Sequence, residues 1–537
     1  MTRLLQHWVT EQAGKRPASP AVVSGDATLT YAELDTLSTQ VARLLREAGC
    51  QRFDRVALLM PSSPAAIIGL LGIYKADCIY VPLDTASPVS RLKKILESCE
   101  NQWVLAAGPV APVLTELLGD QSWRQRLRIG WLEDTSPSGV GVEFTLSDVV
   151  NCATAPVASK NASHDPAHIL FTSGSTGMPK GVVLTHANVI PFIEWAVKHF
   201  GMDATDRACA HPPLHFDMSM LDIFCMPAAG GALHLMPREL NPLPNSLAEF
   251  IRASGLTQWY SVPPVLNYLA KFDAVRQNDF PALRRVLWCG DVLPTPALIY
   301  WMQRLPHVTF TNLYGPTETA ISSSYYTVPE CPRDPQAQIP IGEACAGEEL
   351  LVLDESRRPV APGQIGDLYI GGVGLAVGYW RDSDRTAEVF VRHPERPSAR
   401  IYKTGDLARI GEDGQVYFLG RRDFQIKSRG YRIELGEIEA GLNAIPGVQE
   451  SAVVAVGTSD FEGVTICCAY VPAPGAELTP ALIRRELSRL VPAYMLPTRW
   501  RAFDSFPRNA SGKIDRRSLK DAFENNDRVD AHAAQTA

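Results

Sequence analysis

Short apolar runs rich in β-branched residues alternate with helical patterns from residue 1 to about residue 420. Residues 55–60 predict a strand, residues 64–75 predict a helix, and residues 78–81 predict a second strand. This rhythm is typical of βαβ units and of largely parallel sheets. The longest apolar stretch, residues 65–74, is about half of the roughly 20 residues that a membrane-spanning helix needs. It therefore predicts a buried core helix.

The pattern changes near residue 363. Residues 363–380 read as short strands separated by glycine, which predicts a β-barrel-like or antiparallel subdomain. Residues 420–430 are rich in cations, and residues 434–442 begin a helical pattern with acids near its start. We therefore predict an α/β fold with a large N-terminal domain, residues 1–422, that holds two βαβ-type subdomains and the β-barrel-like one. A hinge, a small mobile α+β C-terminal domain over residues 423–523 and a disordered tail over residues 524–537 would follow.

Composition and charge limit the function classes. The chain has 537 residues, with 51 Lys plus Arg against 58 Asp plus Glu and a formal net charge of −7. There is no basic excess to neutralise a phosphate backbone, so no nucleic-acid partner is expected. Hydrophobic residues make up 46% and charged residues 20%, an ordinary globular mixture that can form a sizeable core.

The first residues and the cysteines indicate a compartment. His7 and Glu11 lie where a signal peptide needs an apolar run. The eleven Cys are scattered without a Cys-x-x-Cys pair, and the adjacent Cys467 and Cys468 would point to opposite faces of a strand. We expect reduced thiols, a cytoplasmic location and no membrane partner.

Residues 169–186 carry the most informative chemistry. They read Ile-Leu-Phe-Thr-Ser-Gly-Ser-Thr-Gly-Met-Pro-Lys-Gly-Val-Val-Leu-Thr-His: a strand, a loop of Gly and small hydroxylated residues, a Lys and another strand. Such a loop can wrap backbone N–H groups around phosphate oxygens, although it could also be a flexible surface loop. The order Gly-x-x-x-x-Gly-Lys-Ser/Thr is absent, which disfavours an ordinary P-loop NTPase. Residues 371–378 miss a dinucleotide-binding pattern at Val377 and indicate turns.

This loop is one of several motifs by which the chain resembles the adenylate-forming enzymes. Within them it is most similar to amino-acid adenylation domains of nonribosomal peptide synthesis, a source of antibiotics and other secondary metabolites, and to ligases that load D-alanine onto a carrier protein. The resemblance covers almost the whole chain, and its motifs occur in the family's order. Besides the loop they are Leu-Thr-Tyr-Ala-Glu-Leu at 29–34, Asn-Leu-Tyr-Gly-Pro-Thr-Glu-Thr at 312–319, Tyr-Lys-Thr-Gly-Asp at 402–406, residues 420–437, and Asn-Ala-Ser-Gly-Lys-Ile-Asp at 509–515.

The resemblance implies an ATP site with Mg²⁺. Attack of a carboxylate on the α-phosphorus builds negative charge, which a metal ion, hydrogen-bond donors and cations would stabilise. Thr317 would contact the α-phosphate, Glu318 would be the Mg²⁺ ligand, and the mobile Lys513 would bridge the substrate carboxylate and the adenylate; His215 completes the implied catalytic set. The β- and γ-phosphates and the leaving pyrophosphate would be held by Thr172, Ser173, Gly174, Ser175, Thr176, Gly177 and Lys180.

The nucleoside would be held by residues of three motifs. By resemblance, Tyr314 would stack on adenine, Asn312 would bond its exocyclic amine, and Asp406, supported by Arg421, would accept both ribose hydroxyls. The resemblance also assigns Gly290, Asp291 and Gly315 to ATP binding. Taken alone, Glu318 could be a solvated acid, Asp406 could cap a turn, and Lys513 could be a surface charge.

The resemblance also implies a second half-reaction. The small domain would rotate about Asp423, and a phosphopantetheine thiol would attack the adenylate through a tunnel where Gly430 has no Cβ to block it. Lys427 and Arg432 would face the carrier, or would be plain surface charge. Only residues 516–537 follow Asp515, too few for a carrier domain. We expect a separate carrier protein or, as the alternative, coenzyme A.

Asp217, in the segment His-Phe-Asp-Met-Ser at 215–219, indicates the substrate class. An isolated buried carboxylate costs several kcal/mol, so an Asp between apolar residues needs a cationic partner, which the α-ammonium of an amino acid would supply. The resemblance places eight further residues around the substrate side chain, and this mostly apolar lining predicts a compact uncharged side chain. They are Met218, Leu221, Ser261, Leu287, Cys289, Leu313, Ile321 and Ser322.

Two sub-resemblances compete for the amino acid itself. Leu313 and its neighbours resemble enzymes that load L-proline onto a carrier protein, although those have a smaller residue at the position of Cys289 and a Cys at that of Ser322. The segment Trp-Cys-Gly-Asp-Val-Leu-Pro at 288–294 instead resembles D-alanine ligases. L-Proline is our first prediction and D-alanine the alternative. An acyl- or aryl-CoA ligase, a catalytically dead module of the same fold and a luciferase-type oxidase are the other hypotheses.

Overall fold

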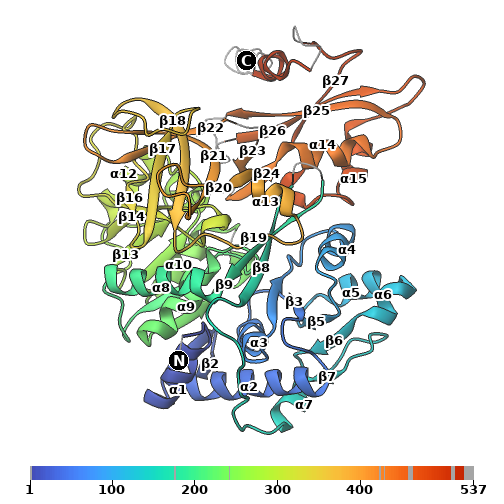
Figure 1. Ribbon diagram of the computed structural model, residues 1–537, viewed down its shortest axis with the longest axis vertical. Helices are drawn as coiled ribbons and strands as arrows, with labels where there is room; N and C mark the ends of the chain where they lie inside the picture. The colour runs from blue at the N-terminus through green and yellow to red at the C-terminus, as the bar shows by residue number, and fades with distance from the viewer. Residues whose placement is uncertain are drawn as a thin grey trace. The chain divides into compact units, whose positions relative to one another are not determined.

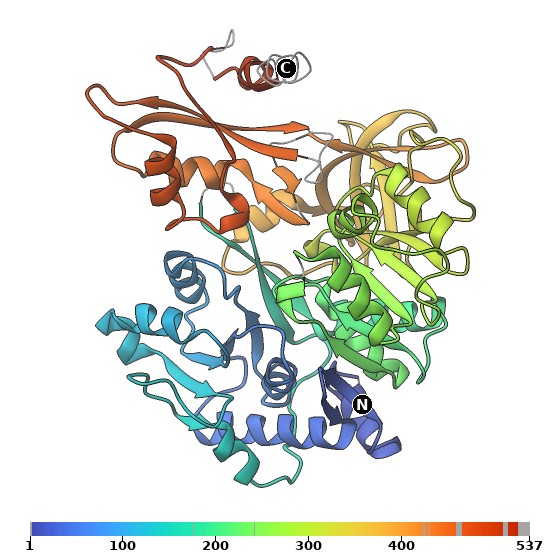
Figure 2. The same cartoon turned by 180° about the vertical axis from the view of Figure 1, so that it is seen from behind.

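The computed structural model describes residues 3–174, 177–240, 242–422, 425–428, 430–457, 464–508 and 514–524. The chain forms two compact units, shown from two sides in Figures 1 and 2. The first unit comprises residues 1–85, 95–171 and 180–422, and the second comprises residues 86–94, 172–179 and 423–537. The fold is the predicted mixed α/β architecture of a large N-terminal and a small C-terminal part.

A nine-stranded sheet in the first unit has the order β16-β15-β14-β13-β12-β10-β11-β1-β2. Its six central strands from β14 to β1 are parallel, and the edge strands are antiparallel. The strands are β1 (Pro20–Ser24), β2 (Ala27–Thr30), β10 (Arg207–Ala210), β11 (Ala232–Leu235), β12 (Gln258–Ser261), β13 (Arg285–Trp288), β14 (Thr309–Tyr314), β15 (Ser324–Thr327) and β16 (Glu343–Ala344).

Helices cover both faces of this sheet. One apolar cluster joins residues of α8 and α9 to Tyr260 and Leu287, and a second joins α10, α11 and α12 to Trp259 and Trp288. The helices are α1 (His7–Lys15), α8 (His186–His199), α9 (Ser219–Ala229), α10 (Pro244–Ala253), α11 (Pro263–Lys271) and α12 (Thr295–Arg304), with the 3-10 turns η1 (Arg238–Leu240) and η2 (Thr317–Thr319).

A second sheet has the order β19-β9-β8-β4-β3-β5-β6-β7. It consists of β3 (Arg55–Leu59), β4 (Ile79–Pro82), β5 (Trp103–Ala106), β6 (Arg128–Trp131), β7 (Phe144–Thr145), β8 (Pro166–Thr172), β9 (Lys180–Thr185) and β19 (Gly378–Tyr379). Its helices are α2 (Tyr31–Glu47), α3 (Pro64–Lys75), α4 (Val89–Ser98), α5 (Ala111–Leu118), α6 (Gln121–Arg126) and α7 (Leu146–Asn151). The expected strand at residues 55–60 and helix at residues 64–75 are both present.

Helix α3 is the buried core helix that its apolar run predicts. Its N-cap, Ser63, accepts a hydrogen bond from the Ala66 N–H, and residues 66–75 are all buried. Even Lys75 is enclosed, because its ammonium donates to Asp35 at 2.7 Å and to Thr39 at 2.9 Å. No helix in the described part of the chain is long and apolar enough to cross a membrane.

The predicted change of pattern after residue 363 corresponds to a third, antiparallel sheet. It pairs β17 (Glu348–Leu353), β18 (Ile365–Gly372), β20 (Phe390–Arg392), β21 (Arg400–Ile410) and β22 (Val416–Arg421), beside α13 (Ser383–Val389). The register opposes Asp406 to Arg421 across β21 and β22. The sheet therefore brings two predicted nucleotide-binding residues together.

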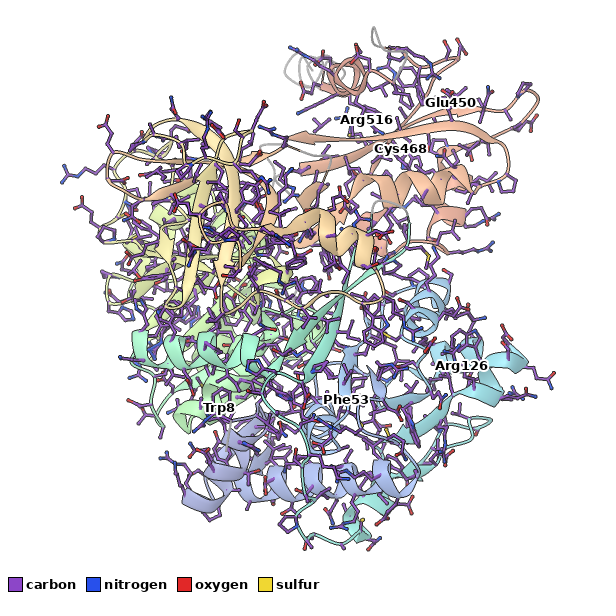
Figure 3. All side chains as sticks on the ribbon, in the orientation of Figure 1. Trp8, Phe53, Arg126, Glu450, Cys468 and Arg516 are labelled. Carbon is purple, nitrogen blue, oxygen red and sulfur yellow. The ribbon has the colours of Figure 1, made fainter. Side chains whose placement is uncertain are left out.

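The second unit contains a hairpin and a three-stranded sheet. These are β23 (Gln425–Ser428) with β24 (Tyr431–Glu434), and β25 (Val448–Gly457), β26 (Val464–Pro472) and β27 (Arg499–Ala502), accompanied by α14 (Leu435–Asn443), α15 (Pro480–Leu487) and η3 (Ala493–Met495). Cys467 and Cys468 belong to different apolar clusters, which confirms that they face opposite sides of β26. Arg516, labelled in Figure 3, forms an ion pair with Glu439.

We expect Gly72 to be required where α2 and α3 cross. A Cβ built at Gly72 would lie 2.6 Å from Cγ1 of Val41 and 3.2 Å from the backbone oxygen of Ser38. Gly72→Ala should therefore lower the free energy of unfolding by about 1–3 kcal/mol. Gly14→Ala in α1 is the matched control: a Cβ there meets no atom within 4 Å, so the change should stabilise by up to about 1 kcal/mol. Denaturant unfolding of both variants checks this, and an equal effect at the two sites would contradict it.

Candidate functional site

The predicted substrate and nucleotide residues of the first unit gather at the carboxyl ends of parallel strands. Asp217 lies between β10 and α9, Cys289 follows β13, and Tyr314 ends β14. In open α/β sheets this edge is where ligands bind, because loops there are free to diverge in sequence. The structure thus brings together residues that are far apart in the chain.

Asp217 is a buried carboxylate whose Oδ2 atom has no hydrogen-bond partner among the described residues. Burial, with a smaller contribution from the charge of Glu318, raises its pKa to about 6. The Thr317 hydroxyl and the backbone N–H groups of Met218 and Ile321 act in the opposite direction. None of these contacts is cationic, so the carboxylate is poised for a positive group that a ligand can bring.

The backbone beside Asp217 is strained. Ala320 has φ +55° and Ile321 has φ +71° directly after η2, and Ile321 is β-branched. Such conformations cost on the order of 1–3 kcal/mol each and cluster at functional sites. Here they aim the Ile321 N–H at the Asp217 carboxylate. No sequence pattern reveals this strain.

Glu318 is fully buried and firmly held. Its Oε1 accepts a hydrogen bond from the Tyr379 hydroxyl at 2.7 Å, and its backbone oxygen accepts from the Ala376 N–H at 2.9 Å. Among the described residues, no group of three or more His, Cys, Asp or Glu could hold a metal ion alone. A single carboxylate nevertheless fits Mg²⁺ at a nucleotide, since that ion keeps water and phosphate oxygens as its other ligands.

The predicted pocket wall is largely one continuous apolar cluster. Ser322, which is also buried, donates from its hydroxyl to Sγ of Cys289 at 3.6 Å. The cluster includes Met218, Leu221, Leu287, Cys289, Leu313 and Ile321.

Ser261 lies differently from the rest of the predicted wall. It pairs with Trp288 across β12 and β13, whereas the preceding residue, Tyr260, pairs with Leu287. Because side chains alternate along a strand, Tyr260 and not Ser261 shares the Leu287 face. The Ser261 hydroxyl instead lies 3.3 Å from Nδ1 of His211. Tyr260 is therefore a pocket-side residue that the sequence reasoning missed.

Three of the predicted nucleoside-binding residues form a bonded group. The Tyr314 hydroxyl donates to Asp406, and Arg421 forms an ion pair with the other oxygen of the same carboxylate. Asn312 donates from its side-chain amide to the Pro340 oxygen at 2.8 Å. Burial and the Asp406 charge hold the pKa of Tyr314 well above its usual value, so its phenol stays protonated.

Gly315 and Gly290 permit close approach of the backbone. A Cβ at Gly315 would lie 2.6 Å from Cα of Ser322, and Gly290 has φ +95°. Asp291 accepts a hydrogen bond from the Val292 N–H at 2.8 Å. Both glycines thus sit where a side chain would strain or displace the pocket backbone.

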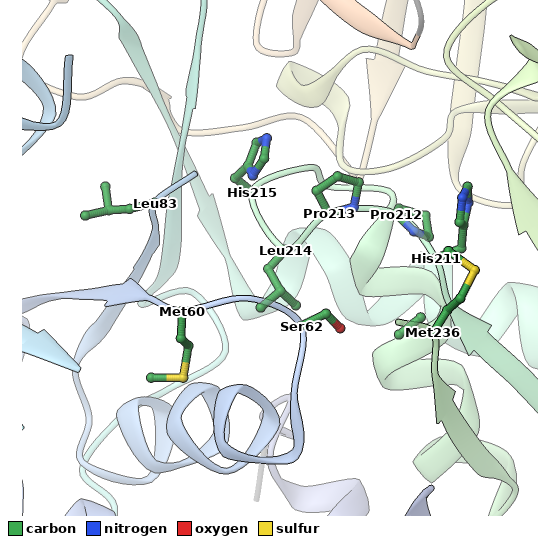
Figure 4. A pocket seen from close by; sticks show the side chains of 10 residues that line it. Met60, Ser62, Leu83, His211, Pro212, Pro213, Leu214, His215 and Met236 are labelled. Atoms are coloured by element: carbon green, nitrogen blue, oxygen red, sulfur yellow. The ribbon is translucent and has the colours of Figure 1, made fainter. Parts of the chain in front are cut away.

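His215 lines a small cavity of about 30 Å³ behind the loop that leads to Asp217. Met60, Ser62 and Leu83 close the cavity from the second sheet, and the labelled sticks in Figure 4 show Leu214 pointing towards Met60. The ring of His215 packs edge-on against Phe216 at 4.9 Å. The predicted catalytic His215 is therefore placed beside the Asp217 loop.

The predicted phosphate loop is divided between the two units. Lys180 belongs to the first unit, where its ammonium lies 5.8 Å from the ring centre of Tyr379. Residues 172–179 group with the second unit, and Thr172 ends β8 at the start of that segment. The Ser173 hydroxyl donates to the Arg432 oxygen at 2.8 Å.

Inside the second unit this loop has two further contacts. The Gly174 N–H donates to Glu437 at 3.2 Å, and the Gly177 oxygen accepts from Lys94 at 3.0 Å. Lys427 opposes Arg432 in the β23–β24 hairpin, and Gly430 in its turn has φ +81°. Four predicted residues, Ser175, Thr176, Asp423 and Lys513, lie outside the described residues.

Known protein families and relatives match this chain in sequence over most of its length. The model of the AMP-binding enzyme family matches residues 9–380, and that of the AMP-binding enzyme C-terminal domain matches residues 437–513. Tyrocidine synthase 3 of Brevibacillus parabrevis is 32% identical over 97% of this chain, and bacitracin synthase 1 of Bacillus licheniformis is 34% identical over 95%. The chain spans only 8% and 9% of the lengths of these two relatives.

Solved structures are similar as well. The adenylation domain AlmE of Vibrio cholerae, in complex with glycyl-adenosine-5'-phosphate, has a TM-score of 0.81 and 25% sequence identity. The match covers 97% of this chain and 98% of that one. The similarity therefore extends over almost the whole of both chains.

We expect Asp217→Asn to stabilise the unliganded protein at neutral pH. The pKa of Asp217 in the folded protein, about 6, lies above the ordinary value of 3.8. Ionisation of Asp217 therefore lowers the free energy of unfolding by about 3 kcal/mol. This loss is absent at low pH and is complete above the folded pKa. The variant should be more stable than the wild type by up to that amount at pH 8, and equal to it below about pH 4. Denaturant unfolding across this range checks the prediction, and a difference independent of pH would contradict it.

Proposed function

The chain belongs to the AMP-binding enzyme family, and from that premise we propose that it activates a small, compact amino acid, with L-proline as the first candidate. In the proposed reaction the substrate carboxylate attacks the α-phosphorus of ATP. A new O–P bond forms, the bond between the α-phosphorus and the bridging oxygen of pyrophosphate breaks, and aminoacyl-AMP and pyrophosphate result. The overall reaction balances without an oxidant or a further co-reactant.

Asp217 is the single observation that carries the proposal. One buried oxygen has no hydrogen-bond partner in the described part of the chain, and the pKa is raised, so the unliganded ion is costly. An α-ammonium group would remove that cost by forming a buried ion pair. An acid without an amino group would leave the carboxylate unpaired. This argument favours an amino acid over the alternative of an acyl- or aryl-CoA ligase.

The ATP site would use side chains that are already oriented. Asp406 would accept the ribose hydroxyls from its place between Tyr314 and Arg421. Glu318 and Thr317 would lie at the magnesium ion and the α-phosphate. Bound Mg²⁺ would supply a counter-charge for the phosphoryl oxygens. Fixed donors and cations of this kind act mainly by stabilising charge that builds in the transition state.

Lys180 and Lys513 are the cations proposed for the first half-reaction. Lys180 is buried beside Tyr379, next to the Tyr379–Glu318 hydrogen bond. Its charge would help to hold the β- and γ-phosphates, and Lys513 would bridge the substrate carboxylate and the adenylate. Both roles come from the family resemblance and are testable by substitution.

The product would then pass to a thiol. We propose transfer of the aminoacyl group to the phosphopantetheine of a separate carrier protein, with release of AMP and formation of a thioester. The support is the similarity to peptide synthases such as tyrocidine synthase 3. Asp423, Lys427 and Gly430 would serve this step as hinge and tunnel residues, and the domain division at residues 422 and 423 is part of the proposal.

A compact side chain is supported by the apolar wall and by one relative. AlmE is described with glycyl-adenosine-5'-phosphate, an adenylate of the smallest amino acid. D-Alanine remains the second candidate because Trp288-Cys289 resembles the motif of D-alanine ligases. A methylene difference is worth about 1–3 kcal/mol in such pockets, so side activities are expected.

The proposal is tested by pyrophosphate release with ATP and Mg²⁺ in the presence of single acids. The panel is L-proline, D-alanine, L-alanine, L-valine and benzoate. L-Proline should give the highest kcat/KM. A higher kcat/KM for D-alanine would make D-alanine, and not L-proline, the substrate. Activity with benzoate alone would refute the role of Asp217.

Asp217→Asn should lower kcat/KM for the amino acid about 100-fold, since loss of a buried charge pair costs about 3 kcal/mol. The KM for ATP should change little. Asp222→Asn, inside the adjacent helix α9, is the matched control: burial holds the pKa of Asp222 well above its usual value, so the substitution replaces one neutral group by another. Equal losses in both variants would show a structural effect instead.

The KM for the amino acid should also depend on pH. Because the pKa of Asp217 is about 6, the ionised form that binds an ammonium disappears as pH falls below that value. KM should rise about tenfold for each pH unit below 6 and should be flat above pH 7. Initial rates at saturating ATP measure this, and the same acid limb in Asp217→Asn would assign it to another group.

A further inference from the structure

Tyr260 lies among the predicted amino-acid pocket residues although no motif points to it. Its side chain is fully buried and belongs to the same apolar cluster as Leu221, Leu287 and Leu313. Its strand partner is Leu287, which fixes the face of the sheet to which the phenol points. The position is thus set by register as well as by packing.

The phenol reaches the polar end of the pocket. Burial raises the pKa of Tyr260 well above its usual value, with Cys289 and Asp217 adding to the rise and the nearby Ser322 side chain opposing it. These three groups are all predicted pocket residues. The tip of the Tyr260 side chain is therefore close both to the residue that would bind the α-ammonium and to two that would surround the substrate side chain.

The Tyr260 hydroxyl has no hydrogen bond of standard geometry within the described chain. A buried hydroxyl without a partner is costly, and core tyrosines normally place their O–H against a backbone or side-chain acceptor. Asp222 and Gln258 nearby show the same feature, each with one unpartnered buried oxygen. The packing that holds Tyr260 here is thus maintained at the expense of hydrogen bonding.

We propose that Tyr260 closes the amino-acid pocket beyond the substrate α-carbon and so restricts the substrate to a short side chain. The proposal rests on the proposed activation of an amino acid and deepens it by naming the residue that limits substrate size. A large aromatic side chain near Asp217 leaves little length for a substrate side chain beyond the α-carbon. Glycine, alanine and the folded ring of proline are short enough, whereas leucine and phenylalanine are not.

Tyr260→Ala should open the pocket. In pyrophosphate release, the ratio of kcat/KM for L-leucine to kcat/KM for L-proline should rise at least tenfold, because each added methylene in an apolar pocket contributes about 10-fold or more to selection. If the Ala variant does not fold, Tyr260→Val introduces a β-branched residue suited to a strand and should show the same change to a smaller degree. Tyr260→Phe keeps the size and should keep the wild-type ratio.

Tyr80 provides a matched control. It is also a fully buried strand tyrosine whose hydroxyl has no partner in the described structure, but it lies on β4 of the other sheet. Tyr80→Val should change stability without changing the substrate ratio. An unchanged ratio in folded Tyr260→Val, or an equal change in Tyr80→Val, would overturn the proposal.

Failure of the proposed function gives a different result. If the wild-type protein activates acetate or hexanoate but no amino acid, the proposal of amino-acid activation is wrong. The ratio of kcat/KM for hexanoate to kcat/KM for acetate then tests the role of Tyr260. That ratio should rise at least tenfold in Tyr260→Val if the residue limits size, and an unchanged ratio would overturn its role. A wild-type protein that turns over none of these acids would overturn both proposals.

Discussion

A buried carboxylate that has no cationic contact among the described residues is the constraint on which the site depends. Asp217 is held at the start of α9, where Thr317, Met218 and Ile321 donate to it but do not neutralise it. Burying such a charge is costly in the unliganded state. The positive φ angles of Ala320 and Ile321 add backbone strain at the same place. The protein therefore keeps a local arrangement that a ligand bearing a positive charge would relieve.

The rest of the first unit fixes the geometry around this charge. Parallel strands bring Cys289, Leu313 and Tyr314 to one edge of the nine-stranded sheet. The antiparallel sheet supplies Asp406 and Arg421 from adjacent strands. The strand registers leave these side chains few alternative positions. A scaffold of this kind holds groups ready for a charge that appears only during reaction.

Much of the fold follows from patterns that are local in sequence. The apolar runs of β3 and α3 are enough to predict a strand and a helix without knowledge of the rest of the chain. The site motifs could also be recognised, because Gly and hydroxyl residues in an unusual order have few other uses. The grouping of residues 86–94 and 172–179 with the C-terminal unit could not be predicted, because it depends on contacts such as Gly174 with Glu437 that join distant segments.

The predicted pocket also shows what the sequence alone could not supply. Ser261 and Tyr260 are adjacent, and a shift of one residue moves a side chain to the other face of a strand. Only the pairing of β12 with β13 shows that Tyr260 shares the Leu287 face. The strain at Ile321 is equally hidden, because a β-branched residue rarely adopts a positive φ and no neighbouring residue announces it.

Proton release on amino-acid binding tests the central role of Asp217 most directly. Calorimetry of L-proline binding in buffers of different ionisation enthalpy gives the number of protons released. With a pKa of about 6, pairing with an α-ammonium should release close to half a proton at pH 6 and almost none at pH 8, and Asp217→Asn should release none at either. Binding without proton release at pH 6, or equal release by the variant, would show that Asp217 does not hold the ammonium group.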